Sequence, residues 1–433
     1  METMTHTLLD ELRWRGLLYQ HTDGVAALLQ RGLASGYVGF DPTAASLHVG
    51  SLVPIMALVH LQRSGHRPIA LVGGGTGMIG DPSGRDSERT LLSVEQVDAN
   101  VRGIRAQLER FLEFGDAADN GTAAILVDNA EWLRSLRMVE FMRDVGKHFT
   151  VNYMMQKESV KARLDAGISY TEFSYMLLQA YDFLELHRRY GVRLQLGGSD
   201  QWGNITAGIE LIRRTEGAEA HAATLPLVTT ASGAKFGKSV AGAIWLDPSL
   251  TSPYEFYQFW LNVDDRDVGR YLRYFTLLGR EEIESLDRAT ESQPERREAQ
   301  QTLARDMTSR VHGEDALGAA LEVTGFLFGG LEPKALSPAA LEVLSAEAPF
   351  VEVKEADMSD GTHGLDVLKL LVVSGLAASN GAARRLLEQG GVSVNRRKLS
   401  AQDRYVDASV LLHGCYVILG KGKRDYAVVR VIR

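Results

Sequence analysis

The sequence has a single cysteine, Cys415, among its 433 residues. One cysteine excludes an intramolecular disulfide and a metal site built from several thiolates, and it fits a reducing compartment. No apolar run approaches the roughly 20 residues that a membrane-spanning helix needs. The first dozen residues carry acids and lack a basic stretch followed by an apolar one, so we expect no secretory signal there. The sequence therefore predicts a cytoplasmic protein with no membrane partner.

An excess of positive charge is also missing, because the formal net charge is −8. This balance argues mildly against a surface that binds nucleic acid everywhere. The charge is uneven, however, since residues 365–433 contain 12 Lys and Arg against 5 Asp and Glu. These residues form either a module that binds a polyanion or a solvated basic face, and their charge alone leaves both readings open.

The hydrophobic pattern indicates an α/β protein of several domains. Four short, almost continuous apolar runs are candidate strands, at residues 36–40, 69–73, 123–127 and 192–196. Helical patterns lie between and before them, the clearest at 94–111 and one at 8–33. This alternation predicts a doubly wound, Rossmann-like domain over residues 1–228, with a parallel sheet that is covered on both faces.

After residue 228 the strand pattern stops. We expect four further parts, namely a mobile lysine-containing linker at 229–253, an α-helical domain at 254–330, an acidic linker with several prolines at 331–364, and a small α+β domain at 365–433.

Residues 36–51 give the strongest indication of a ligand site. The strand that ends at Phe40 is followed by a turn, and Ser46 offers a hydroxyl cap to a helix that begins at Leu47. A helix N-terminus that follows a strand favours an anion, because its N–H groups are unpaired and its dipole is positive there. We therefore expect the phosphate of a nucleotide close to His48 and Gly50.

A glycine-rich run follows the second strand, and Gly75, Gly77 and Gly80 satisfy the pattern G-x-G-x-x-G. The pattern suggests a dinucleotide site, but the next residues, Asp81-Pro82-Ser83-Gly84, cannot open a packed helix. A close approach of the backbone to a ligand and a tight turn at the sheet edge remain alternatives.

Three later stretches also carry polar groups. Tyr175, Gln179 and Asp182 share one face of an expected buried helix at 171–189, where they form either an internal hydrogen-bond network or a ligand site. Asp200 follows two glycines after the fourth strand and could accept the hydroxyls of a ribose. Residues 231–239 form a basic loop that nearly matches a P-loop, and its lysines either reach a phosphate or stay exposed.

Together these stretches resemble the bacterial type of tyrosyl-tRNA synthetase, a class I aminoacyl-tRNA synthetase. Five motifs carry the resemblance in order along the chain, at residues 37–51, 77–84, 173–182, 197–204 and 235–239. The resemblance implies that tyrosine reacts with ATP, used with Mg²⁺, to form tyrosyl-adenylate and pyrophosphate. The tyrosyl group then passes to the 3′ end of the tyrosine tRNA. No tightly bound cofactor and no protein-built metal site are implied.

The resemblance also implies three sets of site residues. The catalytic residues that contact the phosphates are Thr43, His48, Arg85, Arg89, Lys235, Lys238 and Ser239. L-tyrosine is held by Tyr37, Asp81, Tyr175, Gln179, Asp182 and Gln201, with Tyr37 and Asp182 on its phenol. ATP is bound by Gly39, Asp41, His48, Gly50, Ser51, Gly198, Asp200 and Lys238.

The same family is homodimeric, binds the anticodon of its tRNA through a helical domain that corresponds to residues 254–330, and binds tRNA also through a small C-terminal domain. The implied dimer interface is at residues 132–160. The implied tRNA-binding residues are Arg384, Arg385, Arg396, Arg397, Lys398, Lys421, Lys423 and Arg424.

The chain departs from the family pattern at three positions. Ser51 replaces the second histidine of the class signature, Arg85 stands where many relatives have lysine, and Pro54 lies within the first helix. Two other functions stay open at this point. One is an NAD-dependent oxidoreductase that uses the glycine-rich run, and the other is an RNA-binding protein whose catalytic domain is inactive.

Overall fold

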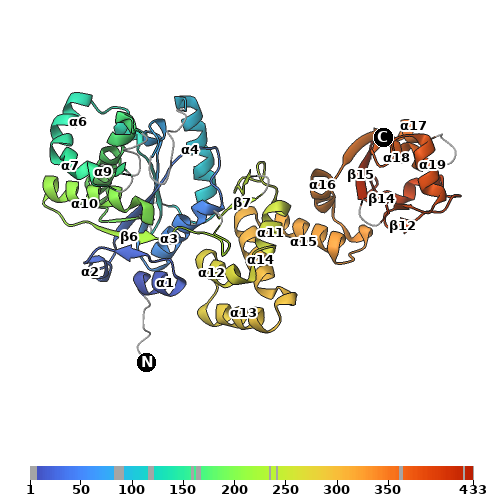
Figure 1. Cartoon of the computed structure of the whole chain (residues 1–433), viewed down its shortest axis with the longest axis horizontal. Coiled ribbons are helices and arrows are strands. Elements are labelled where there is room, and N and C mark those ends of the chain that lie inside the picture. The colour runs from blue at the N-terminus through green and yellow to red at the C-terminus, as the bar shows by residue number, and fades with distance from the viewer. Residues whose placement is uncertain are drawn as a thin grey trace. The chain divides into compact units, whose positions relative to one another are not determined.

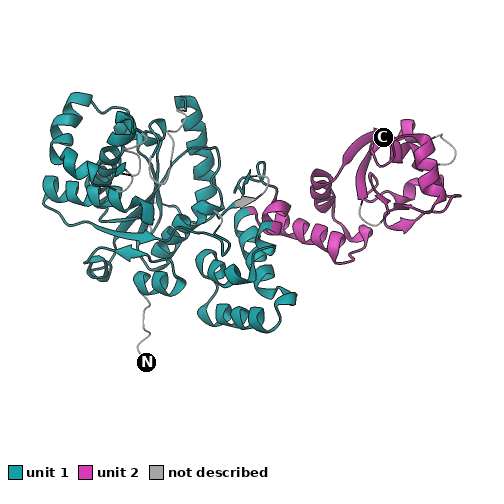
Figure 2. Cartoon of the chain, viewed as in Figure 1, with its two compact units in different colours: residues 1–251, 259–311 teal, residues 252–258, 312–433 magenta. Residues whose placement is uncertain are grey.

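The structure is a computed structural model that describes residues 7–81, 92–115, 121–157, 160–161, 167–233, 236–239, 242–359, 364–422 and 425–432, without the side chains of Lys238 and Ser239. The chain forms two compact units (Figure 2). Unit 1 contains residues 1–251 and 259–311, and unit 2 contains residues 252–258 and 312–433. The helical region expected at 254–330 is thus shared between the units, and the proposed domain boundaries stay a prediction.

A six-stranded sheet forms the centre of unit 1 (Figure 1). Its strands, in spatial order, are β1 (Gln20–His21), β6 (His221–Leu225), β5 (Leu194–Gly198), β2 (Ser35–Phe40), β3 (Arg67–Val72) and β4 (Ile125–Asp128). All neighbours are parallel except β1, which runs antiparallel to β6. Because the chain winds from β2 toward β4 in one direction and from β5 to β6 in the other, the predicted doubly wound fold is confirmed.

Helices cover both faces of this sheet, with α9 and α10 on one side and α3 and α4 on the other (Figure 1). The helices of the α/β part are α1 (Leu8–Arg15), α2 (Val25–Gln30), α3 (Leu52–Arg63), α4 (Val94–Leu108), α5 (Ala130–Leu133), α6 (Met138–Asp144), α7 (Val151–Met155), α9 (Tyr170–Tyr190) and α10 (Trp202–Glu216). Short 3₁₀ turns are η1 (Val49–Ser51), η2 (Thr76–Met78), η3 (Gly146–His148) and η4 (Ser199–Gln201). The remaining elements of unit 1 are the hairpin β7 (Lys238–Ser239) and β8 (Gly242–Ala243), with helices α12 (Asp265–Phe275) and α13 (Arg280–Ser292) and the turn η5 (Pro294–Arg296).

Local sequence explains where the long helices begin and end. Ser93 and Gln96 form a reciprocal capping box at the start of α4. The side chain of Ser169 caps α9, and Gly191 ends that helix in a left-handed conformation. The two helices predicted at 94–111 and 171–189 are therefore confirmed, with α4 ending slightly earlier.

The single helix predicted over residues 8–33 is wrong. Gly16 and Gly24 have φ values of +75° and +89°, so the chain leaves the helical conformation at both positions. The segment divides into α1, the edge strand β1 and α2. The apolar spacing continued across both glycines, which is why the pattern suggested one helix.

Unit 2 is built around a five-stranded sheet with the order β12 (Arg397–Lys398), β11 (Val392–Val394), β14 (Tyr416–Lys421), β15 (Asp425–Ile432) and β9 (Phe350–Lys354). A small second sheet pairs β10 (Leu365–Asp366) with β13 (Tyr405–Val406). The helices are α15 (Glu314–Phe328), α16 (Pro338–Glu347), α17 (Glu355–Met358), α18 (Val367–Val373) and α19 (Asn380–Glu388), with 3₁₀ turns η6 (Pro333–Ala335) and η7 (Ala408–Val410). Two helices, α11 (Pro253–Leu261) and α14 (Glu298–His312), contribute residues to both units.

The acidic stretch 331–364 differs from the linker that its composition predicts. It contains α16 and strand β9, and β9 pairs in parallel with β15. Val353 of β9 is buried in the core of unit 2 together with residues of α18 and β14. The small C-terminal fold therefore includes residues before position 365, because its sheet needs β9 as an outer strand.

Candidate active site

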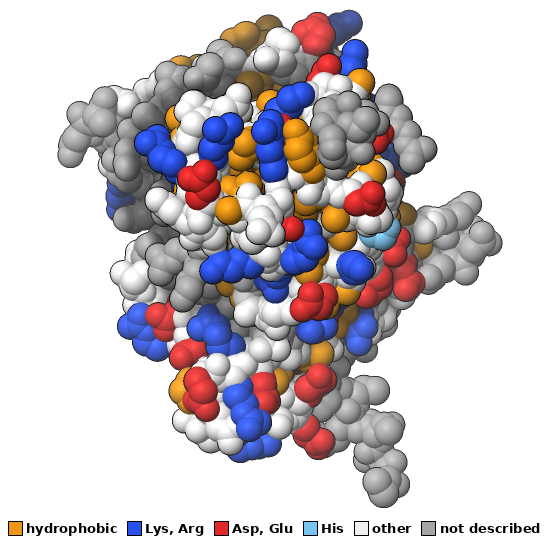
Figure 3. Space-filling model, turned by 90° about the vertical axis from the view of Figure 1, so that its right-hand side faces the viewer, with side chains coloured by type: hydrophobic (Ala, Val, Ile, Leu, Met, Phe, Trp, Pro, Cys, Tyr) orange, Lys and Arg blue, Asp and Glu red, His pale blue; other side chains and the backbone are white. Residues whose placement is uncertain are grey.

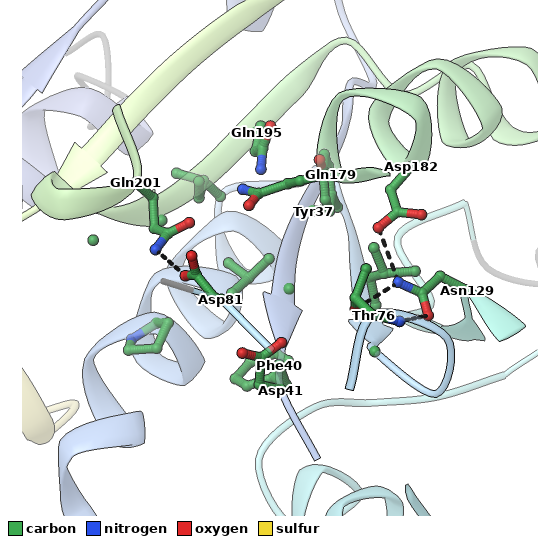
Figure 4. A pocket seen from close by; sticks show the side chains of 18 of the residues that line it. Tyr37, Phe40, Asp41, Thr76, Asp81, Asn129, Gln179, Asp182, Gln195 and Gln201 are labelled. Carbon is green, nitrogen blue, oxygen red and sulfur yellow. Dashed lines mark hydrogen bonds between the residues drawn. The ribbon is translucent and has the colours of Figure 1, made fainter. Parts of the chain in front are cut away.

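The carboxyl ends of β2 and β5 meet where the strand order reverses, which is the place where doubly wound sheets bind ligands. A cavity of about 230 Å³ opens there (Figure 4). Its polar lining comes from β2, η2, α9, β5, η4 and the connections that follow strands, and the side chains are Tyr37, Asp41, Thr76, Asp81, Asn129, Tyr175, Gln179, Asp182, Gln195 and Gln201. The structure therefore brings together all six residues that were predicted to hold tyrosine. We call this cavity the first pocket.

One end of the first pocket is a buried acid with two fixed donors. Asn129 Nδ2 donates to Asp182 Oδ2 at 2.9 Å, and Trp132 Nε1 donates to Asp182 Oδ1 at 2.8 Å. The Tyr37 hydroxyl lies in the same pocket, is buried, and has no hydrogen-bond partner among the described residues. A buried hydroxyl without a partner is costly unless a ligand supplies one.

The pKa of Asp182 is raised to about 7, mainly by burial; the hydrogen bonds from Asn129 and Trp132 oppose this rise, and the charges of Asp41 and Asp128 contribute to it. Burial likewise raises the pKa of Tyr37 well above its usual value, and the Asp182 carboxylate adds to this effect. The phenol of Tyr37 therefore stays protonated. A hydroxyl on a ligand can donate to Asp182 and accept from Tyr37 at this end of the pocket.

The middle of the first pocket carries carboxylates and amides. Tyr175 Oη donates to Asp41 Oδ1 at 3.3 Å, and Gln201 Nε2 donates to Asp81 Oδ2 at 2.7 Å. The carbonyl oxygen of Gln179 accepts from Asn204 at 2.9 Å. The Asp41 and Asp81 carboxylates line the same cavity and favour a cationic ligand such as an ammonium group. A compact molecule with an ammonium group and a distant hydroxyl fits this distribution of charge.

The glycine-rich run forms the wall of the first pocket and does not open a helix. Gly74 N–H donates to Asp128 Oδ1, and Gly75 N–H donates to Asn129 Oδ1 at 2.7 Å. A Cβ on Gly74 would lie 2.3 Å from the Asp128 carboxylate, so only glycine fits there. The run thereby places Thr76 in the pocket, where it accepts a hydrogen bond from Asn129. This geometry gives no support to a dinucleotide fingerprint.

A second cavity of about 300 Å³ adjoins the first pocket. The two cavities share residues 39–41 and Pro54 as a common wall. Its other lining residues are Thr43, Ser46, Leu47, His48, Gly50, Ser51 and Trp245. We call it the phosphate cavity, because it surrounds the helix start where an anion was expected.

His48, and not Ser46, caps the helix start at this cavity. Its ring Nδ1 accepts from Gly50 N–H at 3.0 Å, so in the neutral ring Nε2 carries the proton. Ser46 is buried instead and donates to the Leu47 carbonyl, which corrects its predicted role as the cap. Pro54 occupies the third position of α3, where a backbone N–H has no intrahelical partner, so it fits there without a lost hydrogen bond.

The segment that follows the basic loop also reaches the phosphate cavity. Val49 N–H donates to the Ile244 carbonyl, and Leu246 N–H donates to the Leu47 carbonyl, both at 2.9 Å. The Trp245 ring packs edge-on against His48, with ring centres 6.1 Å apart. The backbone of Lys238 and Ser239 lies in the hairpin strand β7. Arg85, Arg89 and Lys235 lie outside the described residues.

The predicted site residues are not all at the two cavities. Asp200 lines neither cavity and is solvent-exposed. Sequence reasoning also missed Asn129, Trp132 and Gln195. Gln195 is buried within β5, and its side-chain oxygen has no partner among the described residues. A lone polar residue inside a buried apolar strand was the available signal.

The predicted tRNA-binding residues differ in their surroundings. Arg384, Arg385, Arg397 and Lys398 are exposed in unit 2, whereas Lys423 and Arg424 lie outside the described residues. The Arg396 guanidinium donates to the carbonyl groups of Phe326 and Leu331 and lies over the Phe326 ring. On the face drawn in Figure 3, basic side chains are scattered among acidic ones.

In the described part of the chain, no helix is long and apolar enough to cross a membrane. The same residues contain no group of three or more His, Cys, Asp or Glu side chains that could hold a metal ion.

Comparisons with known proteins agree over almost the whole chain. Residues 31–329 match the family model of tRNA synthetases class I (W and Y), and residues 345–429 match that of the tyrosine–tRNA ligase SYY-like C-terminal domain. A tyrosine–tRNA ligase of Roseiflexus castenholzii is 53% identical over 98% of this chain and 100% of its own length. One of Anaeromyxobacter dehalogenans strain 2CP-1 is 54% identical over 98% and 99%. The solved structure of a C-terminally truncated mitochondrial tyrosyl-tRNA synthetase of Aspergillus nidulans gives a TM-score of 0.65 at 31% identity and covers 74% of this chain and 94% of that one.

Proposed function

This chain belongs to the class I tRNA synthetase family of the tryptophan and tyrosine enzymes and works as a tyrosine–tRNA ligase; we propose that the first pocket holds the tyrosine and the phosphate cavity the triphosphate of ATP. The observation that carries this assignment is the closed end of the first pocket. There the Tyr37 hydroxyl has no partner among the residues that the structure describes, and the Asp182 carboxylate is held by two donors. A phenol supplies both the acceptor and the donor that this end needs.

The ammonium group of tyrosine then lies near Asp81, Tyr175 and Gln179. Gln201 orients the Asp81 carboxylate through the 2.7 Å hydrogen bond between them. Gln179 is oriented in the same way by Asn204. With both ends held, the carboxylate of tyrosine points toward the wall that the two cavities share.

In the first step an oxygen of that carboxylate attacks the α-phosphate of ATP, and pyrophosphate leaves. We assign His48 and Thr43 to the leaving phosphates, because both line the phosphate cavity and the protonated Nε2 of His48 can donate to a developing negative charge. Gly50 and Ser51 add the start of η1 to the same site. Gly39 and Asp41 stand between the two substrates, and Gly198 and Asp200 remain the proposed ribose contacts.

The family pattern assigns further cations to the phosphates, namely Arg85, Arg89, Lys235 and Lys238, with Ser239. Their positive charges stabilise the negative charge on the phosphates. The reaction therefore needs no general base and no covalent intermediate, and it depends on positioning and electrostatics. We propose that Mg²⁺ arrives on the phosphates of ATP, which is the usual route for this ion. In the second step the terminal ribose hydroxyl of the tRNA attacks the tyrosyl carbonyl, and AMP leaves.

Tyrosine-dependent exchange of pyrophosphate into ATP tests the assignment directly. We expect the purified protein to catalyse this exchange with tyrosine and only weakly with phenylalanine. A folded protein that binds RNA but gives no exchange would instead be an inactive relative, and it would refute the assignment.

We further propose that the enzyme is a cytoplasmic homodimer. Apolar side chains are exposed on two successive helices within the predicted interface at 132–160: Met138, Val139 and Met142 on α6, with Val151 and Met155 on α7. Exposed apolar groups gathered in this way favour a protein interface. Support for the cytoplasm comes from the bacterial relatives and from the single cysteine.

Replacing Val139 by aspartate is expected to convert the dimer into a monomer, because Val139 is 79% exposed in the isolated chain and a charge at the centre of an apolar interface would be desolvated. Sedimentation velocity at micromolar concentration measures the change. Glu140→Gln, an exposed neighbour on α6, serves as the control and should leave the dimer intact. A variant that stays dimeric places the interface elsewhere.

Removing residues 330–433 is expected to leave pyrophosphate exchange within about twofold of the full chain and to lower tRNA charging at least about tenfold, because basic side chains that contact tRNA phosphates are lost. The cut falls before β9, so no strand of the five-stranded sheet is left without its partner. The salt dependence of charging should also become weaker. Equal losses in both activities would show that these residues support the fold of the catalytic part instead.

A further inference from the structure

Helix α12 binds residues 229–231, where the basic loop begins. Ala231 N–H donates to Asp267 Oδ2 at 2.8 Å, and the Arg270 guanidinium donates to the Thr229 carbonyl at 2.6 Å. Arg270 also pairs with Asp267, whose side chain is buried. The carboxylate is therefore kept in place by a cation on its own helix and is presented to the loop.

Farther along the loop, the ring of Phe236 packs against the same helix. Phe236 is 6% exposed, and it stacks on Phe275 with ring centres 5.4 Å apart and planes 11° apart. It also lies against Tyr271, at 4.9 Å, and Trp260 closes the cluster. Stacked and edge-on ring pairs have preferred geometries and stabilise a contact beyond the apolar area that they bury.

A short path leads from Phe236 to the phosphate cavity. The next residue, Gly237, has a φ of +79°, and its carbonyl accepts from Ile244 N–H at 3.0 Å. The Ile244 carbonyl in turn accepts from Val49 N–H, next to His48. A Cβ on Gly237 would lie 2.7 Å from Val49 Cγ2, so the two segments are in close contact.

Helix α12 is itself fixed to the α/β part of unit 1. The buried guanidinium of Arg15, on α1, donates to the carbonyl group of Arg273 in the last turn of α12 and to those of Thr276 and Leu278 just beyond it. These bonds satisfy helix-end carbonyls that would otherwise lack partners. The helix is thus a rigid support whose position is set by the catalytic domain.

We propose that Phe236 and Asp267 are positioning residues for adenylate formation, because they hold residues 229–231 and 236–237 on α12 and so fix the wall of the phosphate cavity around His48. The inference rests on the function proposed above. Helix α12 lies in the region expected to bind the anticodon. Under this proposal it also supports the first chemical step. Neither side chain lines the phosphate cavity, so both act through the backbone they hold.

The test separates ATP from tyrosine in the pyrophosphate exchange of the full-length protein. Phe236→Ala is expected to raise the KM for ATP or lower kcat by about 10–100-fold, as a displaced catalytic group does, while the KM for tyrosine changes less than about twofold. Phe236→Met fills most of the space and should restore activity. Tyr274→Leu is the matched control, because Tyr274 is 7% exposed on the same helix and its ring packs against Phe275 and near Gly16 at the end of α1.

Asp267 gives a second test that does not depend on the aromatic cluster. Asp267→Ala leaves Ala231 N–H without its acceptor and should raise the KM for ATP, whereas Asp267→Asn keeps an acceptor oxygen and should stay close to the parent. Folded Phe236→Ala and Asp267→Ala variants with parental constants for ATP would overturn the proposal. So would an equal loss in Tyr274→Leu or an equal rise in the KM for tyrosine. A parent protein without exchange would instead refute the proposed function.

Discussion

Replacing Asp182 by asparagine is expected to lower kcat/KM for tyrosine by roughly 30–150-fold and to change that for phenylalanine only slightly, since a hydrogen bond to a charged group is worth about 2–3 kcal/mol. The substrate phenol loses its anionic acceptor, and phenylalanine has no hydroxyl to lose. Pyrophosphate exchange with each amino acid measures the ratio. Because both rates come from one variant, a general folding defect cancels.

Tyr37→Phe is the matched variant at the same end of the pocket. It removes a neutral hydrogen-bonding group, so we expect a loss of only about 3–10-fold for tyrosine. Within the described part of the chain the Tyr37 hydroxyl has no hydrogen-bond partner to lose, so the free energy of unfolding should not fall. Tyrosyl-tRNA synthetases are the known example of such discrimination, by about 10⁵-fold against phenylalanine. That factor describes the family and does not follow from this structure. Unchanged selectivity in both variants would contradict the orientation of the substrate.

The pKa of about 7 at Asp182 adds a control that depends on pH. A phenol donates best to the ionised carboxylate, so the KM for tyrosine should fall as the pH rises through 7. In Asp182→Asn this part of the pH dependence should be absent. The folded carboxyl holds its proton longer than the unfolded one. The free energy of unfolding of the empty protein should therefore fall as the pH rises from about 4 toward 7.

Replacing His48 by asparagine is expected to lower kcat for pyrophosphate exchange by about 10²–10³-fold, because a donor to the developing charge on the leaving phosphates is lost. The KM for tyrosine should change less than about twofold, since His48 lines only the phosphate cavity. Asparagine is a good helix cap and keeps an acceptor for Gly50 N–H, so the start of η1 should be preserved.

His48→Ala separates the two roles of the ring. It should reach a similarly low kcat and in addition lose about 0.5–2 kcal/mol of stability, because the cap is gone. Thermal unfolding of the three proteins measures this difference. If His48→Asn keeps the parental kcat, the ring serves only as a cap, and the phosphates are stabilised by other groups.

The central strands could be predicted from the sequence because parallel strands that are buried on both faces read as apolar runs. The edge strand β1 could not, since two residues carry no pattern. β6 was also missed, because its sequence, His-Ala-Ala-Thr-Leu, is only weakly apolar. The linker prediction at 331–364 weighed prolines and acids and overlooked β9, whose partner β15 lies far away in sequence.

At the candidate site, the sequence revealed residues that belong to motifs and missed those that support them. Asn129 follows a strand and looks like a turn residue, and Trp132 looks like part of a core. Only the fold brings both to Asp182, which lies about fifty positions later on α9. Side-chain partners that are distant in sequence have no local pattern, so this part of the site needed the structure.

The pairing of β9 with β15 has a consequence for synthesis on the ribosome. β9 leaves the exit tunnel long before β15, which is the last strand of the described chain. During that interval its N–H and C=O groups form an open edge that can pair with other nascent chains. Unit 1 contains β1 to β6 and can complete its sheet earlier, in keeping with the N-terminal-first order of cotranslational folding. A chaperone that binds residues 350–354 during this interval would therefore keep β9 from pairing with other chains.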